Sequence, residues 1–393
     1  MAIRNEALAC AAFQKLKAAY DDRKAVLSAW KSSGKKVVCI AGYDVPEEII
    51  LAGGMLPFRV TGYYGGERKS ADKYLEYSFG AIWKGLWESI AEDYAGLMDY
   101  LVFSSSSDMF LKLFYYFRTM QRLEPERPLP ELKYLDFELV EHVFKSQERN
   151  ERELRDLIEC VEGWSGNKVT ADALKEAIAL CNDYRAALTE FSALRGKDNC
   201  CVTGSEALVV IGGSMFMEKA EAIAAVRAVT EAAERWPAAE GARVYYVGSP
   251  QETTEVYELA EANGVNFVGE DHDMGARMFD TQVREDIEPV SALADRLLKR
   301  MPSSEKGTIA NRVKAIGEKL DATGAAGFLT YMNNNDEAYV WDYPSIRKNV
   351  LEPRGIPSDT VQKQTWPLTE PEALAGQFRA FAAAIKEAEA KNG

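Results

Sequence analysis

The sequence of 393 residues has few of the side chains that bind metals or act as nucleophiles. It contains six cysteines and only two histidines, His142 and His272. No two cysteines have the C-x-x-C spacing, which argues against a zinc knuckle or a local redox motif. Six cysteines in a chain of this length also do not indicate a disulfide framework. Chemistry that depends on Cys–His or Ser–His pairs therefore has few candidates.

Other absences exclude whole classes of protein. No apolar run approaches the roughly 18 residues that span a bilayer. The first 17 residues mix charged residues with Ala and Leu and lack the basic-then-apolar order of a secretion signal. Acidic residues outnumber basic ones by 61 to 47, and no basic stripe offers a nucleic-acid surface. We therefore expect a cytoplasmic protein that binds neither membranes nor nucleic acids.

Glycine-rich phosphate-binding signatures are missing as well. Neither G-x-G-x-x-G nor the P-loop pattern occurs, which disfavours classical dinucleotide binding and NTP hydrolysis. What is present is the composition of a globular protein, with 47% apolar residues, enough for a sizeable core. The length predicts two or three domains.

Short apolar runs alternate with helical patterns along most of the chain. The expected strands lie at 36–42, 55–61, 100–104, 133–137, 207–211, 243–247, 266–269 and 327–331. Such alternation is typical of parallel sheets that are covered by helices on both faces. We therefore predict an α/β protein with two doubly wound, Rossmann- or flavodoxin-like parallel-sheet domains, an N-terminal helix and a helical insert.

The expected organisation has four parts. An N-terminal helical lead spans 1–35, and the first α/β domain spans 36–145. A helical segment follows at 146–204, and the second α/β domain spans 205–393. The two α/β halves are candidates for distant copies of one unit.

In open parallel sheets, ligands bind at the carboxyl ends of the strands. Four loops qualify, namely 42–48, 104–108, 248–252 and 333–336, because each follows an expected strand and is rich in small or polar residues. A cleft shared by the two domains is the expected site. For any single loop, helix capping is the commoner reason for such a composition.

Several charged residues near these loops are candidates for chemistry. Glu47 and Glu48 are adjacent, so at most one faces a cleft if the segment is helical. One of them could act as a general acid or base. Stabilisation of the helix dipole is the commoner role for acids in a first turn.

Two further groups of charged residues are ambiguous. The triplet Asp271-His272-Asp273 is weak as a metal site without a second cluster, and a surface loop is the expected setting. Arg59, Arg68 and Arg277 are candidates for pairing with phosphates, and ordinary salt bridges are the alternative.

Several blocks of sequence, taken in order, resemble the 2-hydroxyacyl-CoA dehydratase and benzoyl-CoA reductase subunit family, in its D-component form. The opening block is GYDVPEEII at 42–50, followed by AGGMLP at 52–57. Further matching blocks lie at 71–74, 98–102, 169–182, 270–279, 341–344 and 355–357. The resemblance covers nearly the whole chain, and the order of the blocks makes it specific.

The resemblance implies a fold of two α/β domains and a heterodimer of related subunits acting in anaerobic metabolism. Each subunit of such enzymes commonly holds a [4Fe-4S] cluster through three cysteines, and an ATP-dependent activator protein supplies electrons. The substrate is a CoA thioester. This sequence departs from the pattern, because Gly80, Ser107 and Asn335 stand where the cluster cysteines are expected. Ser and Asn are poor ligands for iron–sulfur clusters, so we expect no cofactor in this chain.

Three interpretations follow. In the preferred one, the chain is a clusterless subunit that helps to form the acyl-CoA site of a heteromeric dehydratase or reductase, while a homologous cysteine-bearing partner carries the cluster. In the second, it is a redox-free acyl-CoA enzyme with Glu47 or Glu48 as the catalytic carboxylate. In the third, it is a structural or regulatory protein. The expected substrate-binding residues are Tyr43, Arg59, Ser107, Asp108, Asn335 and Asp336.

Overall fold

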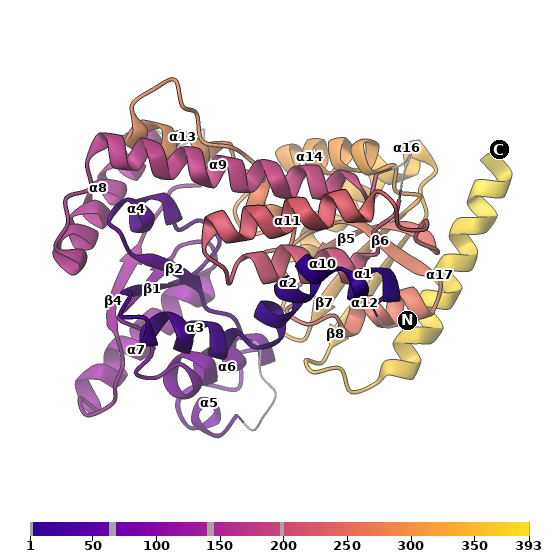
Figure 1. Ribbon diagram of the computed structural model, residues 1–393. Helices are drawn as coiled ribbons and strands as arrows, with labels where there is room; N and C mark the ends of the chain where they lie inside the picture. The colour runs from indigo at the N-terminus through magenta and orange to yellow at the C-terminus, as the bar shows by residue number, and fades with distance from the viewer. Residues whose placement is uncertain (1–2, 63–67, 140–144, 197–199, 393) are drawn as a thin grey trace.

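A computed structural model describes residues 3–62, 68–139, 145–196 and 200–392 (Figure 1). It contains two four-stranded sheets whose neighbouring strands are all parallel. The strand orders are β2-β1-β3-β4 and β6-β5-β7-β8, so both sheets follow the same pattern. The predicted α/β fold with two doubly wound parallel sheets is therefore confirmed.

The first sheet is covered by helices on both faces. Its strands are β1 (Val37–Ala41), β2 (Leu56–Arg59), β3 (Tyr100–Ser104) and β4 (Glu131–Leu135). Val38 and Ile40 pack under a layer that contains α4 (Glu47–Ala52), α8 (Ser146–Ser165), α9 (Ala171–Ala193) and α13 (Pro289–Lys299). Val37 and Cys39 face the other way, toward α3 (Arg23–Ser32), α6 (Ala81–Glu88) and α7 (Asp108–Leu123). This period of two is that of a strand buried on both faces.

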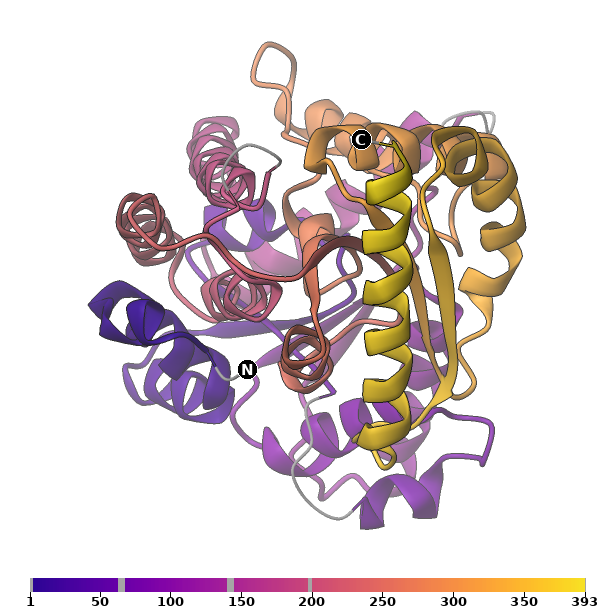
Figure 2. The ribbon, with the colours of Figure 1, turned by 90° about the vertical axis from the view of Figure 1, so that its right-hand side faces the viewer.

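The second sheet repeats the arrangement. Its strands are β5 (Ala242–Gly248), β6 (Val265–Asp271), β7 (Gly327–Asn333) and β8 (Ser358–Gln364). One face packs against α14 (Ile309–Thr323), α15 (Ala338–Ile346) and the π-helix η3 (Arg347–Leu351). The other face packs against α10 (Gly204–Ser214), α12 (Glu255–Ala262) and α17 (Pro371–Asn392). Figure 2 shows α17 on the side of the molecule that faces the viewer, with this sheet beside it.

Helices fill the space between the two sheets. The N-terminal segment, expected to hold one helix within 1–35, consists of α1 (Asn5–Ala9), α2 (Ala11–Asp21) and α3, with breaks at Cys10 and Asp22. Helix α2 packs against α10 and α11 (Lys219–Ala233), and α9 packs against both α4 and α11. The remaining short elements are α5 (Lys69–Tyr74), η1 (Ser89–Asp93), η2 (Ala276–Phe279) and α16 (Glu352–Arg354).

The strand expected at 207–211 is wrong, because this segment lies within helix α10. Every residue of α10 is buried, so its apolar residues do not follow the 3.6-residue spacing by which a half-exposed helix is predicted. The Thr203 and Glu206 side chains form a capping box that starts the helix. Strand β8 and helices α13 and α15 were not expected from the sequence. Within the described residues, no helix has the length and apolar character that a bilayer crossing requires.

Candidate functional site

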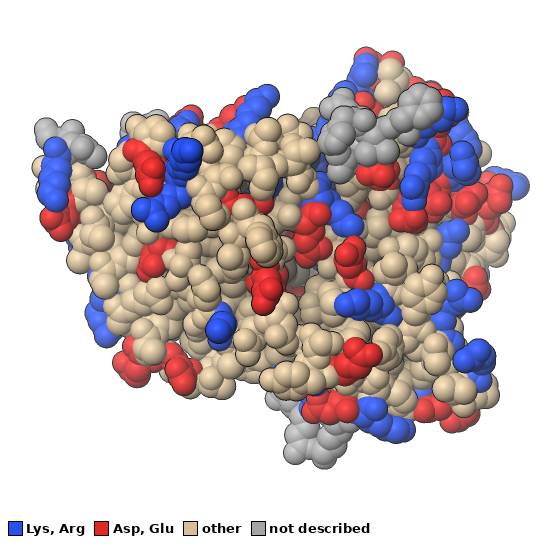
Figure 3. Space-filling model, turned by 180° about the vertical axis from the view of Figure 1, so that it is seen from behind, with Lys and Arg blue, Asp and Glu red and all other residues tan. Residues whose placement is uncertain are grey.

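A cavity of about 410 Å³ lies between the two sheets. Its wall is built by the loops that follow β1, β2 and β3 of the first sheet and β5, β6 and β7 of the second. Strand ends meet here because all strands of each sheet run in the same direction, which gathers their carboxyl ends at one edge. Figure 3 shows a hollow near the middle of the molecule's rear face, with Asp and Glu side chains around it.

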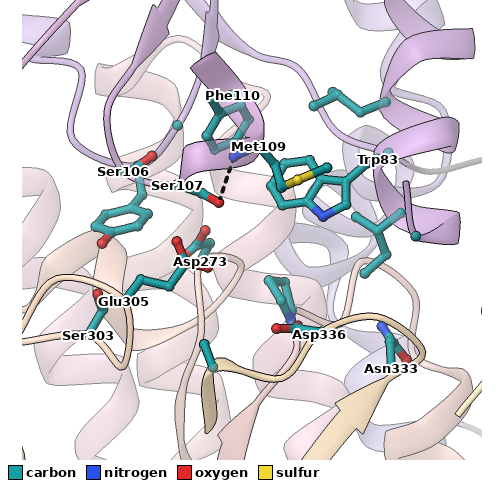
Figure 4. A pocket seen from close by; sticks show the side chains of 18 of the residues that line it. Trp83, Ser106, Ser107, Met109, Phe110, Asp273, Ser303, Glu305, Asn333 and Asp336 are labelled. Atoms are coloured by element: carbon teal, nitrogen blue, oxygen red, sulfur yellow. Dashed lines mark hydrogen bonds between the residues drawn. The ribbon is translucent and has the colours of Figure 1, made fainter. Parts of the chain in front are cut away.

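The first-domain wall depends on tight turns after β1 and β3. Gly42 has φ of +120°, and a Cβ atom placed there would lie 2.0 Å from the Ser104 hydroxyl. Only glycine fits this conformation and this contact. After β3, Ser107 is the N-cap of α7, and its hydroxyl accepts a hydrogen bond from the Met109 backbone N–H at 3.3 Å (Figure 4).

The second-domain wall is rich in carboxyl groups. Figure 4 shows the side chains of Asp273 and Glu305 pointing toward one another beside Ser107. Burial raises the pKa of Glu305 to about 7, and the neighbouring Ser107 hydroxyl partly opposes this effect. Asp336 accepts a hydrogen bond from the Ser249 hydroxyl at 2.5 Å, and burial raises its pKa to about 6. Burial also raises the pKa of Asp273.

Two arginines contribute positive charge to the cavity. Arg59, at the end of β2, is 5% exposed and donates hydrogen bonds to the Gly42 carbonyl oxygen at 3.3 Å and to the Met278 sulfur at 3.1 Å. Burial lowers the pKa of Arg59. Arg277 is fixed by an ion pair with Asp271 at 2.6 Å, and its guanidinium lies 5.6 Å from the centre of the Tyr43 ring.

The six residues predicted to bind substrate all line this cavity. They are Tyr43, Arg59, Ser107, Asp108, Asn335 and Asp336. Asn335 has φ of +67°, in the left-handed region that Asn tolerates better than most residues, and it forms the turn after β7.

Glu47 and Glu48 do not line the main cavity. Glu47 pairs with Lys219 at 2.5 Å, and Glu48 pairs with Arg185. Glu47 borders a separate cleft of about 20 Å³, which has room for about one water molecule. Both ion pairs connect α4 to the helices that cover it. Burial alone would raise the pKa of Glu48, but the positive charge of Arg185 outweighs this effect, so the pKa of Glu48 is lowered.

The three positions at which the resemblance expects cluster cysteines come together in the cavity. Gly80, Ser107 and Asn335 all line it. A Cβ atom placed on Gly80 would lie 3.8 Å from the Asn335 Cβ atom. None of the six cysteines belongs to the cavity lining. Gly80, Ser107 and Asn335 offer no thiolate, which is the ligand that iron–sulfur clusters usually require.

The part of the chain that the structure describes also holds no group of three or more His, Cys, Asp or Glu side chains placed to bind a metal ion. The surface loop expected around His272 is wrong, because His272 is fully buried. Its Nδ1 accepts a hydrogen bond from the Met274 backbone N–H at 3.2 Å, and its Nε2 lies 2.9 Å from the Tyr257 hydroxyl. Asp271 pairs with Arg277 and Arg312. His142 lies outside the described residues.

Sequence reasoning missed several residues of the cavity. Glu305 lies in an irregular segment between α13 and α14, where no strand marks the position. Glu252 follows β5 inside the predicted loop 248–252, and Asp273 follows β6 in the triplet assigned to a surface loop, but neither was named as a substrate-binding residue. Trp83 enters from α6, one turn after Gly80.

Comparison with known proteins agrees with this architecture. Residues 43–380 match the family model described as 2-hydroxyglutaryl-CoA dehydratase, D-component. The beta subunit of (R)-phenyllactyl-CoA dehydratase from Clostridium sporogenes is 25% identical over 339 residues, which cover 85% of this chain and 88% of that protein.

Two further relatives point the same way. Subunit beta of (R)-2-hydroxyglutaryl-CoA dehydratase from Acidaminococcus fermentans is 22% identical, over 88% of this chain and 90% of that protein. A putative dehydratase subunit from Escherichia coli is 27% identical over 52% of this chain and 55% of its own length. With a family match that covers most of its length, the chain belongs to the 2-hydroxyglutaryl-CoA dehydratase D-component family.

Proposed function

We propose that this chain is one subunit of a heteromeric 2-hydroxyacyl-CoA dehydratase, and that its cavity binds the acyl part of a CoA thioester. In this proposal a homologous, cysteine-bearing partner holds the [4Fe-4S] cluster. The observation that carries it is the meeting of Gly80, Ser107 and Asn335 in one cavity that no cysteine lines. The names of two relatives, both beta subunits of acyl-CoA dehydratases, support the heteromeric part.

The cavity has the size and lining of a small-molecule site. Its volume of about 410 Å³ falls within the usual range for ligand pockets. Trp83, Met109 and Phe110 provide an apolar surface for an acyl chain. Arg59 and the Asn333 side-chain amide are donors for a thioester carbonyl oxygen, and the Asn333 Nδ2 atom has no hydrogen-bond partner.

The partner would supply the redox chemistry, and this chain would bind and orient the thioester and exclude water from it. An ATP-dependent activator, an anaerobic pathway and a cytoplasmic location belong to the same proposal. The acid–base role of Glu47 and Glu48 stays a prediction. Their ion pairs with Lys219 and Arg185 suit a role in holding α4 in place.

The test is purification of the tagged chain from its native host without oxygen. We expect a homologous chain with the three cysteines to co-purify in equal amount. After the two chains are separated, iron and acid-labile sulfide should stay with the partner. A chain that purifies alone with a full complement of cluster iron would contradict the proposal.

A second candidate function is redox-free acid–base chemistry on an acyl-CoA. The observation that favours it is the carboxyl pair Glu305 and Asp336, whose pKa values of about 7 and about 6 suit proton transfer near neutral pH. One carboxylate would take the proton next to the thioester carbonyl and return it.

The check is exchange of that proton for deuterium, followed by NMR on propionyl-CoA in D₂O with the chain alone. The exchange should be lost in Glu305→Gln and kept in Glu240→Gln, which changes an exposed carboxylate outside the cavity. Absence of exchange in the parent protein would exclude this candidate.

A further inference from the structure

Four carboxyl groups reach the cavity from four different loops of the second domain. They belong to Glu252, Asp273, Glu305 and Asp336. None forms an ion pair within the described chain, because the nearby bases are held elsewhere. Arg277 pairs with Asp271, and Lys306 lies 3.3 Å from Asp108 at the rim.

The four groups differ in how far neighbouring bases compensate their charge. Asp273 faces Arg59, Arg277 and Arg300, and Glu252 faces Arg23 and Arg59. Among the largest influences on Glu305, the base is Lys306, and the acids Asp273 and Asp336 act against it. Asp336 faces Asp273 and the Ser249 hydroxyl, and no base of the described residues acts on it. Glu305 and Asp336 are therefore the carboxyl groups that most lack a counter-charge.

Glu252 gives independent evidence for a missing hydrogen-bond donor. Its side chain is 7% exposed and lines the cavity, and its Oε2 atom has no hydrogen-bond partner. An unsatisfied buried acceptor is costly, typically about 1–3 kcal/mol, and is rare in native proteins. A ligand that donates hydrogen bonds would remove this cost.

The opposite wall suits an organic cation better than a metal ion. Trp83 and Phe110 face the same cavity, and aromatic faces attract ammonium groups. In the described part of the chain, the carboxyl groups are too dispersed for three of them to hold one metal ion. An ammonium nitrogen holds its acceptors at about 2.8–3.0 Å, further than the roughly 2.0–2.6 Å of a metal–oxygen bond, so it tolerates carboxyl groups that lie further apart.

We infer that the cavity binds a ligand with a cationic nitrogen, held between Glu305, Asp336 and Glu252. This inference rests on the proposed function. It assigns the substrate to the class of acyl-CoA thioesters whose acyl group carries an ammonium group. The amine would lie on the second-domain wall, and the thioester carbonyl would be left for Arg59 on the first.

Binding of a cation should be linked to proton release. Without a ligand, Glu305 and Asp336 are partly protonated near pH 6.5, because burial raises their pKa values to about 7 and about 6. An ammonium group stabilises the ionised carboxylates and expels these protons. Affinity for the amine should therefore rise as pH increases from about 5.5 to 7.5.

The experiment is isothermal titration calorimetry of the full chain with matched CoA thioesters. The probes are 3-aminopropionyl-CoA, 3-hydroxypropionyl-CoA and propionyl-CoA. We expect the amino compound to bind at least about tenfold more tightly than the other two, and to release protons, seen as a heat that depends on the buffer. Glu305→Gln and Asp336→Asn should each remove most of this preference, whereas Glu240→Gln should retain it.

Two outcomes distinguish this inference from the proposed function. Equal or tighter binding of the neutral thioesters overturns the inference and leaves the acyl-CoA site intact. If no thioester binds, the acyl-CoA site fails, and 3-aminopropionamide alone then tests the inference. A rise in melting temperature with this amine in the parent, lost in the E305Q/D336N double variant, supports a cation site. No rise overturns it, and circular dichroism checks that each variant is folded.

Discussion

Buried charged side chains in this protein differ in whether another residue neutralises them. Glu48 and Arg185 form a pair in which both side chains are almost completely buried. The pKa of Glu48 is lowered from its ordinary value of 4.5, so its contribution to stability is present above pH 4.5 and lost as pH falls through the lowered value. The cavity carboxyls Glu252, Asp273, Glu305 and Asp336 behave in the opposite way: their pKa values are raised, because burial outweighs the effect of any neighbouring base. The Glu48–Arg185 pair stabilises the fold, and the cavity carboxyls are available to a ligand.

The Glu48–Arg185 pair gives a prediction for stability. Arg185→Leu leaves Glu48 buried without its partner, which should lower the free energy of unfolding by about 3–5 kcal/mol. The matched control is Arg227→Leu, which breaks an exposed pair between α11 and Asp183 of α9 and should cost about 1 kcal/mol or less. Urea unfolding at pH 7 measures both. Equal losses in the two variants would contradict the difference that we ascribe to burial.

His272 gives a prediction for pH dependence. Because Nδ1 accepts a hydrogen bond, the neutral ring carries its proton on Nε2 and donates it to Tyr257. Burial lowers the pKa of His272 from 6.5 to about 4. Between pH 4 and pH 6.5, the His272 ring is therefore protonated in the unfolded chain and neutral in the folded chain. Stability from this group is complete above pH 6.5 and falls as pH drops toward 4, by about 3 kcal/mol at about 1.4 kcal/mol per pKa unit.

The measurement for His272 is urea unfolding from pH 4 to 7.5 in the parent and in His272→Gln. The variant should be less stable at pH 7.5, since Gln cannot make both hydrogen bonds in the same geometry. Its stability should also fall less steeply with acidification, so the two curves converge toward pH 4. Parallel curves would show that His272 does not titrate differently in the folded and unfolded states.

At the scale of secondary structure, the sequence predicted elements whose patterns are local. The continuous apolar run from Val37 to Ala41, followed by a loop with helix-capping residues, was enough to predict β1. The same pattern predicted neighbouring strands. It failed for α10, where complete burial leaves an apolar run with no period, and for β8, whose mixed polar residues match no strand template. The T-x-x-E capping box at Thr203 was the available signal for α10.

The contact between α10 and α2 gives a prediction at this scale. A Cβ atom on Gly213 would lie 2.2 Å from the Leu16 carbonyl oxygen. This oxygen belongs to the backbone, so it cannot move away by a change of rotamer. Gly213→Ala should therefore separate the two helices and lower the free energy of unfolding by about 1–3 kcal/mol. Gly163→Ala is the control, because nothing lies within 4 Å of a Cβ atom at this position in α8.

The control should change stability in the opposite direction. Ala is favoured over Gly inside a helix by about 0.5–1 kcal/mol, so Gly163→Ala should raise the free energy of unfolding. Thermal unfolding followed by circular dichroism compares the two variants. A destabilising effect of similar size in both would mean that helix packing at Gly213 is not the cause.

At the scale of the whole molecule, the cavity could be predicted only in part. The rule that ligands bind at strand ends brought Tyr43, Ser107 and Asp336 to one site across more than 290 positions of sequence. It could not place Glu305, which reaches the cavity from a loop between helices. It also could not show that Glu47 and Glu48 turn away toward α11 and α9, because their partners lie far along the chain.

The two sheets also share one core. A single cluster of buried apolar side chains includes Val37 and Phe58 of the first sheet and Val244 and Phe267 of the second. Helices α2, α9, α10 and α11 contribute to the same cluster. Neither sheet can lose its covering helices without exposing apolar surface of the other. The boundaries that we predicted at 36, 146 and 205 therefore need not separate units that unfold independently.

We predict a single cooperative unfolding transition for the whole chain. Because burial of the shared cluster stabilises both sheets, loss of either one removes the packing that holds the other. Differential scanning calorimetry should give equal calorimetric and van't Hoff enthalpies. The comparison is a pair of single-tryptophan proteins, one retaining Trp87 beside the first sheet and the other Trp236 beside α2. Their fluorescence midpoints in urea should coincide. Two separated midpoints would show that the sheets unfold as independent domains despite the shared core.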